Sequence, residues 1–176
     1  SNTPVELVAP EISPEKIESA VKRFDAFVVA MEGGEVKEPL VLTEGDINAL
    51  IANHPDFEAV SESMVVSIVE DKLTSEVSFS LDSLNLPETF FTEAMKGKYF
   101  NGELTLSVGT VAGRPAMYIE GVSVGGNPLP ASFMSELSKE NILQEAQSDP
   151  EVSQFFDRIG ELKMEDKRLI IAPLPQ

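Results

Sequence analysis

The apolar residues of this chain change their spacing partway along it, and this change limits the fold class more than any other feature. Between Pro14 and Gly34 they recur every three or four residues, which is the spacing of one face of an α-helix. From Met64 to Leu81 they alternate with polar residues, as in a strand with one buried face. Long separate segments of both kinds predict an α+β protein.

Two helices are expected in the first third of the chain. Ser13 is a typical capping residue, Pro14 suits the first helical position, and the glycines at 33 and 34 end the pattern. A second helix is predicted from the cap at Thr43 to the exit at Pro55. The apolar face of the first helix is predicted to hold Ile17, Ala20, Val21, Phe24, Phe27, Val28 and Met31.

Strands follow one another through turns in the middle of the chain. The alternating segment at 64–81 is predicted to be a hairpin with its turn at 70–72. A strand at 104–108, a turn around 112–115 and another strand from Met117 are predicted to follow. In this last strand Val122 falls out of phase with Met117, so we predict a bulge near Glu120 and Gly121. Short helices are predicted at 87–97 and between 130 and 159, and a final hairpin is predicted to bend at 165–167.

These elements predict a twisted, mostly antiparallel sheet of four to six strands, with the long N-terminal helix packed on one face and short helices at the ends. A doubly wound parallel sheet is disfavoured because regular helical crossovers are missing. Residues 1–12 are predicted to be a linker or a cloning remnant, with a removed upstream anchor or signal as an open alternative. Residues 13–176 are predicted to form one domain, which suits a chain of 176 residues.

Composition excludes several function classes. Thirteen Lys and Arg stand against 30 Asp and Glu, and the resulting net charge of −17 repels phosphate backbones, so nucleic acid is not an expected partner. The chain has no cysteine, which excludes disulfides, zinc–thiolate sites and thiol nucleophiles. No apolar run is long enough to span a bilayer, and no signal-peptide pattern is present.

The segment Gly121 to Gly125 spells G-x-S-x-G, the pattern of a nucleophilic serine in many hydrolases. That chemistry needs a helix directly after the serine and a histidine further along the chain. After Ser123 no helix is expected before about Leu129, and the one histidine, His54, lies upstream. We therefore interpret Ser123 as a polar strand residue, and we expect no enzyme activity.

No other chemical motif stands out. His54 is expected at a helix exit as a capping or exposed residue, and it has no second histidine with which to complete a zinc site. Acid pairs such as Glu44 with Asp46 are expected by chance among so many carboxylates, and no phosphate, dinucleotide or calcium motif occurs. We expect no metal and no cofactor.

Aromatic residues come as neighbouring pairs, for example Phe90 with Phe91 and Tyr99 with Phe100. A helix or strand does not bury two neighbouring side chains against one surface. The second side chain of each pair faces the other wall of a closed core, an apolar ligand groove or a partner surface. The candidate ligand contacts are Phe90, Phe91, Met95, Phe133 and Phe156.

Two segments, LTEGDINALI at Leu42 to Ile51 and VGGNPLPASFMSEL at Val124 to Leu137, flank the alternating strands. With them, most of the stretch from Leu42 to Ala172 resembles the uncharacterised, membrane-anchored YpmS-type domains of bacteria. It resembles more distantly the tubular lipid-binding modules, in which a long helix lies in a curved antiparallel sheet. The resemblance implies an extracytoplasmic domain behind one N-terminal anchor, with lipid handling as its surmised role and no family catalytic residue.

Three functions remain open after the sequence. The leading expectation is a non-enzymatic cell-envelope domain, membrane-anchored or secreted, that binds an apolar ligand or lipid in a continuous cavity between helix and sheet. The alternative is an envelope protein-interaction or scaffolding domain with a fully packed core. The third is a hydrolase that uses Ser123 or a carboxylate pair, which needs a concave site with converging polar groups.

Overall fold

The structure, a computed structural model, describes residues 1–35, 38–83, 96–146 and 150–175. It is an α+β fold, as predicted, with two antiparallel sheets. The predicted short helix at 87–97 falls largely outside the described residues. The helices are α1 (Pro14–Gly33), α2 (Glu44–Asn53), α3 (Ala131–Leu137), α4 (Leu143–Ala146) and α5 (Pro150–Asp157), with short 3-10 helices η1 (Pro55–Val60) and η2 (Leu81–Ser83).

The smaller sheet has three strands in the order β1-β8-β7, and the larger has five in the order β2-β3-β4-β5-β6. The first strand of the chain therefore pairs with the last, with Leu40 opposite Ile171 and Thr43 opposite Arg168. The strands are β1 (Leu40–Thr43), β2 (Met64–Val69), β3 (Lys72–Ser80), β4 (Tyr99–Val111), β5 (Arg114–Val124), β6 (Asn127–Pro128), β7 (Ile159–Glu165) and β8 (Arg168–Pro173).

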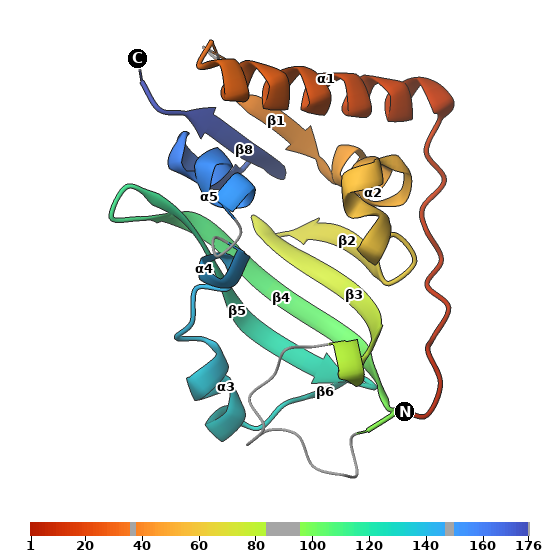
Figure 1. Cartoon of the computed structure of the whole chain (residues 1–176). Helices are drawn as coiled ribbons and strands as arrows, with labels where there is room; N and C mark the ends of the chain where they lie inside the picture. The colour runs from red at the N-terminus through yellow and green to blue at the C-terminus, as the bar shows by residue number, and fades with distance from the viewer. Residues whose placement is uncertain (36–37, 84–95, 147–149, 176) are drawn as a thin grey trace.

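The long helix packs on the smaller sheet and on α2, as Figure 1 shows. The expected single sheet is thus divided in two, because β1 leaves the other early strands and joins the C-terminal hairpin. The periodicity of apolar residues predicts where a strand lies but not which strand pairs with it. The division into two sheets could therefore not be predicted from the sequence.

The ends of α1 are those that the sequence predicts. The Ser13 hydroxyl accepts a hydrogen bond from the Lys16 main-chain N–H at 3.4 Å. At the other end Gly34 adopts the left-handed conformation, with φ +70°, and its N–H reaches the last carbonyls of the helix. Along the face between them Ala20, Phe27 and Met31 are buried.

Helix α2 lies between two buried clusters. One joins α1, α2 and the smaller sheet, whereas the other joins α2 to the larger sheet. Ile47 of α2 packs against both. The helix begins with the predicted capping box: the Thr43 N–H donates to the Asp46 carboxylate at 3.0 Å, and the Asp46 N–H donates to the Thr43 hydroxyl at 3.2 Å.

Within the described ranges, four two-residue turns connect hairpin strands, and in each of them both residues have positive φ, as a type I′ turn requires. Three lie at predicted turns, and the fourth is formed by Gly125 and Gly126. The predicted bulge is also confirmed. Thr105 faces Gly121 while Leu106 faces Ile119, so Glu120 is an additional residue on β5.

Hydrogen bonds join the two sheets directly, both between their turns and between β4 and β7. The Lys167 N–H, in the β7–β8 turn, donates to the Asp71 carboxylate in the β2–β3 turn at 3.0 Å. The Thr110 hydroxyl of β4 hydrogen-bonds both the N–H and the C=O of Leu162 of β7, at 3.1 and 3.3 Å. The sheets are therefore held together by specific polar contacts as well as by α2.

Candidate functional site

A groove of about 470 Å³ lies beside the larger sheet and is partly open to solvent. One wall is the N-terminal segment, and the others come from η1, β2, β3 and the start of β4. Its lining is mainly apolar, and it includes Pro4, Val5, Val60, Met64, Phe79 and Tyr99. Glu62, Ser63, Ser78 and Ser80 add polar groups.

The N-terminal segment is fixed to the sheet by hydrogen bonds. Ser1 exchanges two main-chain bonds with Tyr99, at 2.8 and 3.2 Å. The Asn101 side chain donates to the Thr3 carbonyl at 3.0 Å and accepts from the Val5 N–H at 3.2 Å. The first five residues of the predicted linker are thus part of the folded domain, although they form no helix or strand.

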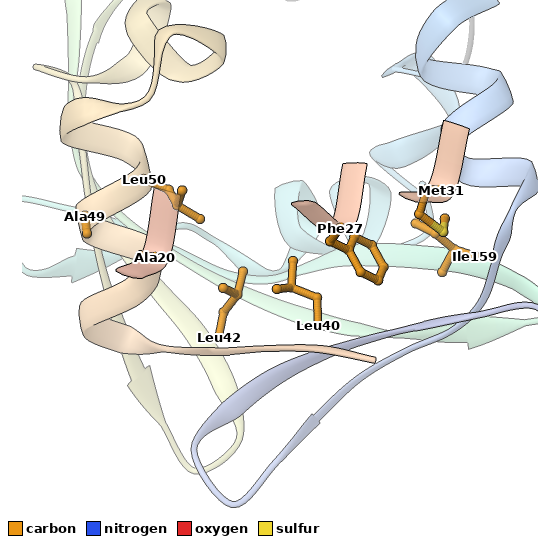
Figure 2. Close-up of a cluster of buried hydrophobic side chains, with 8 residues drawn as sticks. All are labelled: Ala20, Phe27, Met31, Leu40, Leu42, Ala49, Leu50 and Ile159. Carbon is orange, nitrogen blue, oxygen red and sulfur yellow. The ribbon is translucent and has the colours of Figure 1, made fainter. Parts of the chain in front are cut away.

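The space between α1 and the smaller sheet is filled by side chains. Figure 2 shows those of α1, α2, β1 and β7 converging, with Phe27 and Leu40 in the middle of the view. Phe155 of α5 adds an edge contact to Phe27, with ring centroids 6.5 Å apart. The groove of about 470 Å³ therefore lies beside the N-terminal segment and not between α1 and the smaller sheet. Between the end of α1 and β8 the described residues leave a smaller pocket of about 280 Å³, lined among others by Met31, Arg158 and Pro173.

Of the five predicted ligand contacts, the structure describes Phe133 and Phe156 and places these two apart. Phe90, Phe91 and Met95 lie outside the described residues. Phe133 is 53% exposed on α3, and Phe156 of α5 packs against the cluster beneath α1. Figure 1 shows α3 and α5 at separate places in the fold. Neither Phe133 nor Phe156 lines the groove.

Sequence reasoning missed most of the groove because its walls are distant in the chain. The one available signal was the pair Tyr99–Phe100. Of these neighbours only Tyr99 lines the groove, whereas Phe100 stacks on the groove residue Phe79 with ring centroids 5.3 Å apart.

His54 is buried at the junction of α2 and η1. Its Nδ1 accepts from the Asp56 N–H at 3.1 Å, so Nε2 carries the proton and donates to Asp25 of α1 at 2.7 Å. The ring also meets Phe24 and Phe57 edge-on, at 5.0 and 5.8 Å between centroids. Both ring nitrogens thus take part in hydrogen bonds within the protein. Through them His54 caps η1 and joins it to α1. The capping role was predicted, but the burial was not.

Ser123 lies on β5, opposite Glu103 of β4 and Pro128 of β6. The chain turns at Gly125 and Gly126 into β6, and α3 begins only at Ala131. Ser123 is a strand residue followed by a glycine turn, as expected, whereas the short strand β6 after the turn was not predicted. The segment differs from the strand, turn and helix of a nucleophile elbow.

The resolved pKa shifts belong to surface ion pairs. The hydrogen bond to Glu120 raises the pKa of Lys72, and the same bond lowers the pKa of the Glu120 carboxyl. Hydrogen bonds to Glu161 and Glu165 raise the pKa of Lys163. These groups do not line the groove, so the shifts indicate local ion pairing on the sheet surfaces.

In the described part of the chain, no three His, Asp or Glu residues are placed to hold a metal ion together. Over the same residues, no helix has the length and apolar character needed to cross a membrane. Comparison with protein families, with curated proteins and with solved structures found no match to this chain.

Proposed function

We propose that this chain is a non-enzymatic binding domain of the cell envelope, and that its groove holds one apolar ligand such as the acyl chain of a lipid. The observation that supports the ligand is the groove itself. Its volume of about 470 Å³ is within the usual range for small-molecule sites, and its lining is mainly apolar with a few polar groups. The envelope location, membrane-anchored or secreted, is supported by the resemblance to YpmS-type domains.

Charge narrows the ligand class further. The chain carries a net charge of −17, and Glu62 is exposed at the groove. This field repels an anionic headgroup. The hydroxyl of Ser63 suits an uncharged polar group, because it can donate and accept a hydrogen bond. A neutral acyl compound, for example a monoacylglycerol, fits these properties better than a fatty-acid anion.

Native mass spectrometry of the freshly purified chain, beside its denatured mass and an organic extract, tests the proposal. A near-stoichiometric acyl compound in the extract supports it. If the chain is empty, it is titrated with a monoacylglycerol and with the fatty acid of the same chain length. We expect saturable binding of the neutral compound and weaker binding of the anion.

A groove-filling variant locates the site. Ala59 is exposed at the groove, so Ala59→Trp places a large side chain in it without disturbing a buried position. Ala131→Trp, on exposed α3, is the matched control. Loss of binding in Ala59→Trp alone supports the groove, whereas equal binding by both variants places the ligand elsewhere.

The second candidate is a protein-interaction or scaffolding domain. It is favoured by the packed clusters on both sides of α2 and by the half-exposed Phe133. A chain that stays free of ligand after incubation with a lipid mixture favours this function over the first. Phe133→Ser is then the variant to compare with wild type against candidate protein partners.

A further inference from the structure

The Ser78 and Asn101 side chains recognise the main chain of the N-terminal segment. Asn101 binds the Thr3 C=O and the Val5 N–H, which lie two residues apart on one side of an extended chain. The Val5 N–H also donates to the Ser78 hydroxyl at 3.0 Å, and that hydroxyl donates to the Asn101 Oδ1 at 2.7 Å. Ser78 is buried, which fixes the orientation of the pair.

On the N-terminal side of these bonds, the segment is also held by the Ser1–Tyr99 main-chain pair and by Lys98, whose Nζ donates to the Asn2 Oδ1 at 2.7 Å. On the C-terminal side it has few attachments. Val5 and Val8 are 52% and 87% exposed, so they bury little apolar area. No hydrogen bond is made by any residue from 6 to 12, all of which are described. A segment held by a few partly exposed hydrogen bonds belongs to the least stable part of a fold and opens locally.

The held residues also form a wall of the groove. Pro4 lies between Thr3 and Val5, and both Pro4 and Val5 line the groove. A ligand in the groove contacts the segment only while the segment is in place. The contacts between ligand and segment therefore hold the segment in place together with the hydrogen bonds of Ser78 and Asn101.

We infer that Ser78 and Asn101 form a clamp that holds residues 3–5 as a removable wall of the groove, so that clamping and ligand binding strengthen each other. The coupling, though not the clamp, rests on the proposed ligand-binding function. Such coupling is reciprocal, because a clamp that raises ligand affinity is itself stabilised by the ligand to the same extent.

Hydrogen exchange of the Val5 amide in the full chain, followed by NMR, tests the clamp without any ligand. Asn101→Ala and Ser78→Ala each remove one partner of this amide, and we expect exchange about tenfold faster in either variant. Asn127→Ala is the control, because the Asn127 side chain bonds only the nearby Gly125 carbonyl. An unprotected Val5 amide in wild type, or equal protection in Asn101→Ala, overturns the clamp.

A monoacylglycerol as probe tests the coupling. We expect Asn101→Ala to bind it about fivefold more weakly than wild type, and we expect the probe to slow exchange of the Val5 amide. Binding with no change in Val5 exchange overturns the coupling and leaves the ligand-binding function standing. If wild type binds no probe, the ligand-binding function and the coupling both fail, while the clamp is decided by the exchange data alone.

Discussion

Asn48 of α2 hydrogen-bonds both main-chain groups of Val66 on β2. Its Nδ2 donates to the Val66 carbonyl at 2.7 Å, and the Val66 N–H donates to its Oδ1 at 2.8 Å. Nearby, Glu44 accepts from the Ile68 N–H at 2.9 Å. Two helix side chains thus take the place of a neighbouring strand on the open edge of the larger sheet, which protects this edge from pairing with another chain.

Replacing Asn48 by Ala is expected to lower the free energy of unfolding by about 2–4 kcal/mol, because two buried main-chain groups lose their partner. Urea denaturation measures the loss. Asn53→Ala is the control, since the Asn53 side chain bonds only Ala49 within its own helix. A similar loss in both variants contradicts the edge-closing role of Asn48.

Deleting Glu120 is expected to leave the chain folded. The bulge places both Glu120 and Gly121 opposite one residue of β4, so removing one of them straightens β5 and keeps Val122 on its present face. Deletion of Tyr118, by contrast, puts Met117 and Ile119 on opposite faces and is expected to abolish cooperative unfolding. Thermal unfolding followed by circular dichroism compares the two deletions; an unfolded Glu120 deletion contradicts the expectation.

The Glu120 carboxylate is expected to stabilise the fold at neutral pH and to lose this effect in acid. Its hydrogen bond to Lys72 holds its pKa below the usual 4.5, so the contribution is complete above the unfolded-state value and disappears as the pH falls through the folded-state value. The stability difference between wild type and Glu120→Gln should therefore shrink as the pH falls below 4.5.

Glu103→Gln, at an exposed position on the adjacent strand, provides the reference curve for this pH series. The Glu120 effect should also diminish in about 1 M salt, because the ion pair is partly exposed. If the difference in the free energy of unfolding between wild type and Glu120→Gln does not change with pH, the loss of the carboxylate charge is not its cause.

His54→Ala is expected to cost about 2–3 kcal/mol, since it removes the cap of η1, the bond to Asp25 and the ring contacts. His54→Asn should recover part of this loss, because asparagine is also a good N-cap. Chemical denaturation of both variants gives the values, and ¹⁵N NMR of the imidazole reports the proton on Nε2. A proton on Nδ1 is incompatible with the hydrogen bonds described above.

Ala112 is expected to be a site where stability can be gained. It occupies the first position of a type I′ turn with φ +52°, a conformation that asparagine tolerates better than alanine. Ala112→Asn should raise the free energy of unfolding by about 0.5–1 kcal/mol, and Ala112→Val should lower it. Changes in the same direction for both variants contradict this explanation.

Local features of the fold were predictable from the sequence. The caps of α1 and α2, three of the four described hairpin turns and the bulge at Glu120 were foreseen, because each depends on residues within a few positions of one another. The fold class followed from the change in apolar spacing.

Long-range relationships were not predictable. Periodicity does not show that β1 pairs with β8, that Asn48 binds Val66, or that residues 1–5 lie along the sheet. The groove depends on the last of these placements, so its residues could not be named from the sequence. Aromatic pairing indicated two environments for Tyr99 and Phe100 but not the distant segment that faces Tyr99.

The pairing of β1 with β8 sets the order in which the chain can fold during synthesis. Helix α1 leaves the ribosome early, but the sheet that covers Phe27 and Met31 is incomplete until β8 has been made. At ordinary rates of translation this interval is on the order of ten seconds. During that time the apolar face of α1 lacks the sheet that covers it in the folded chain, and it is accessible to chaperones.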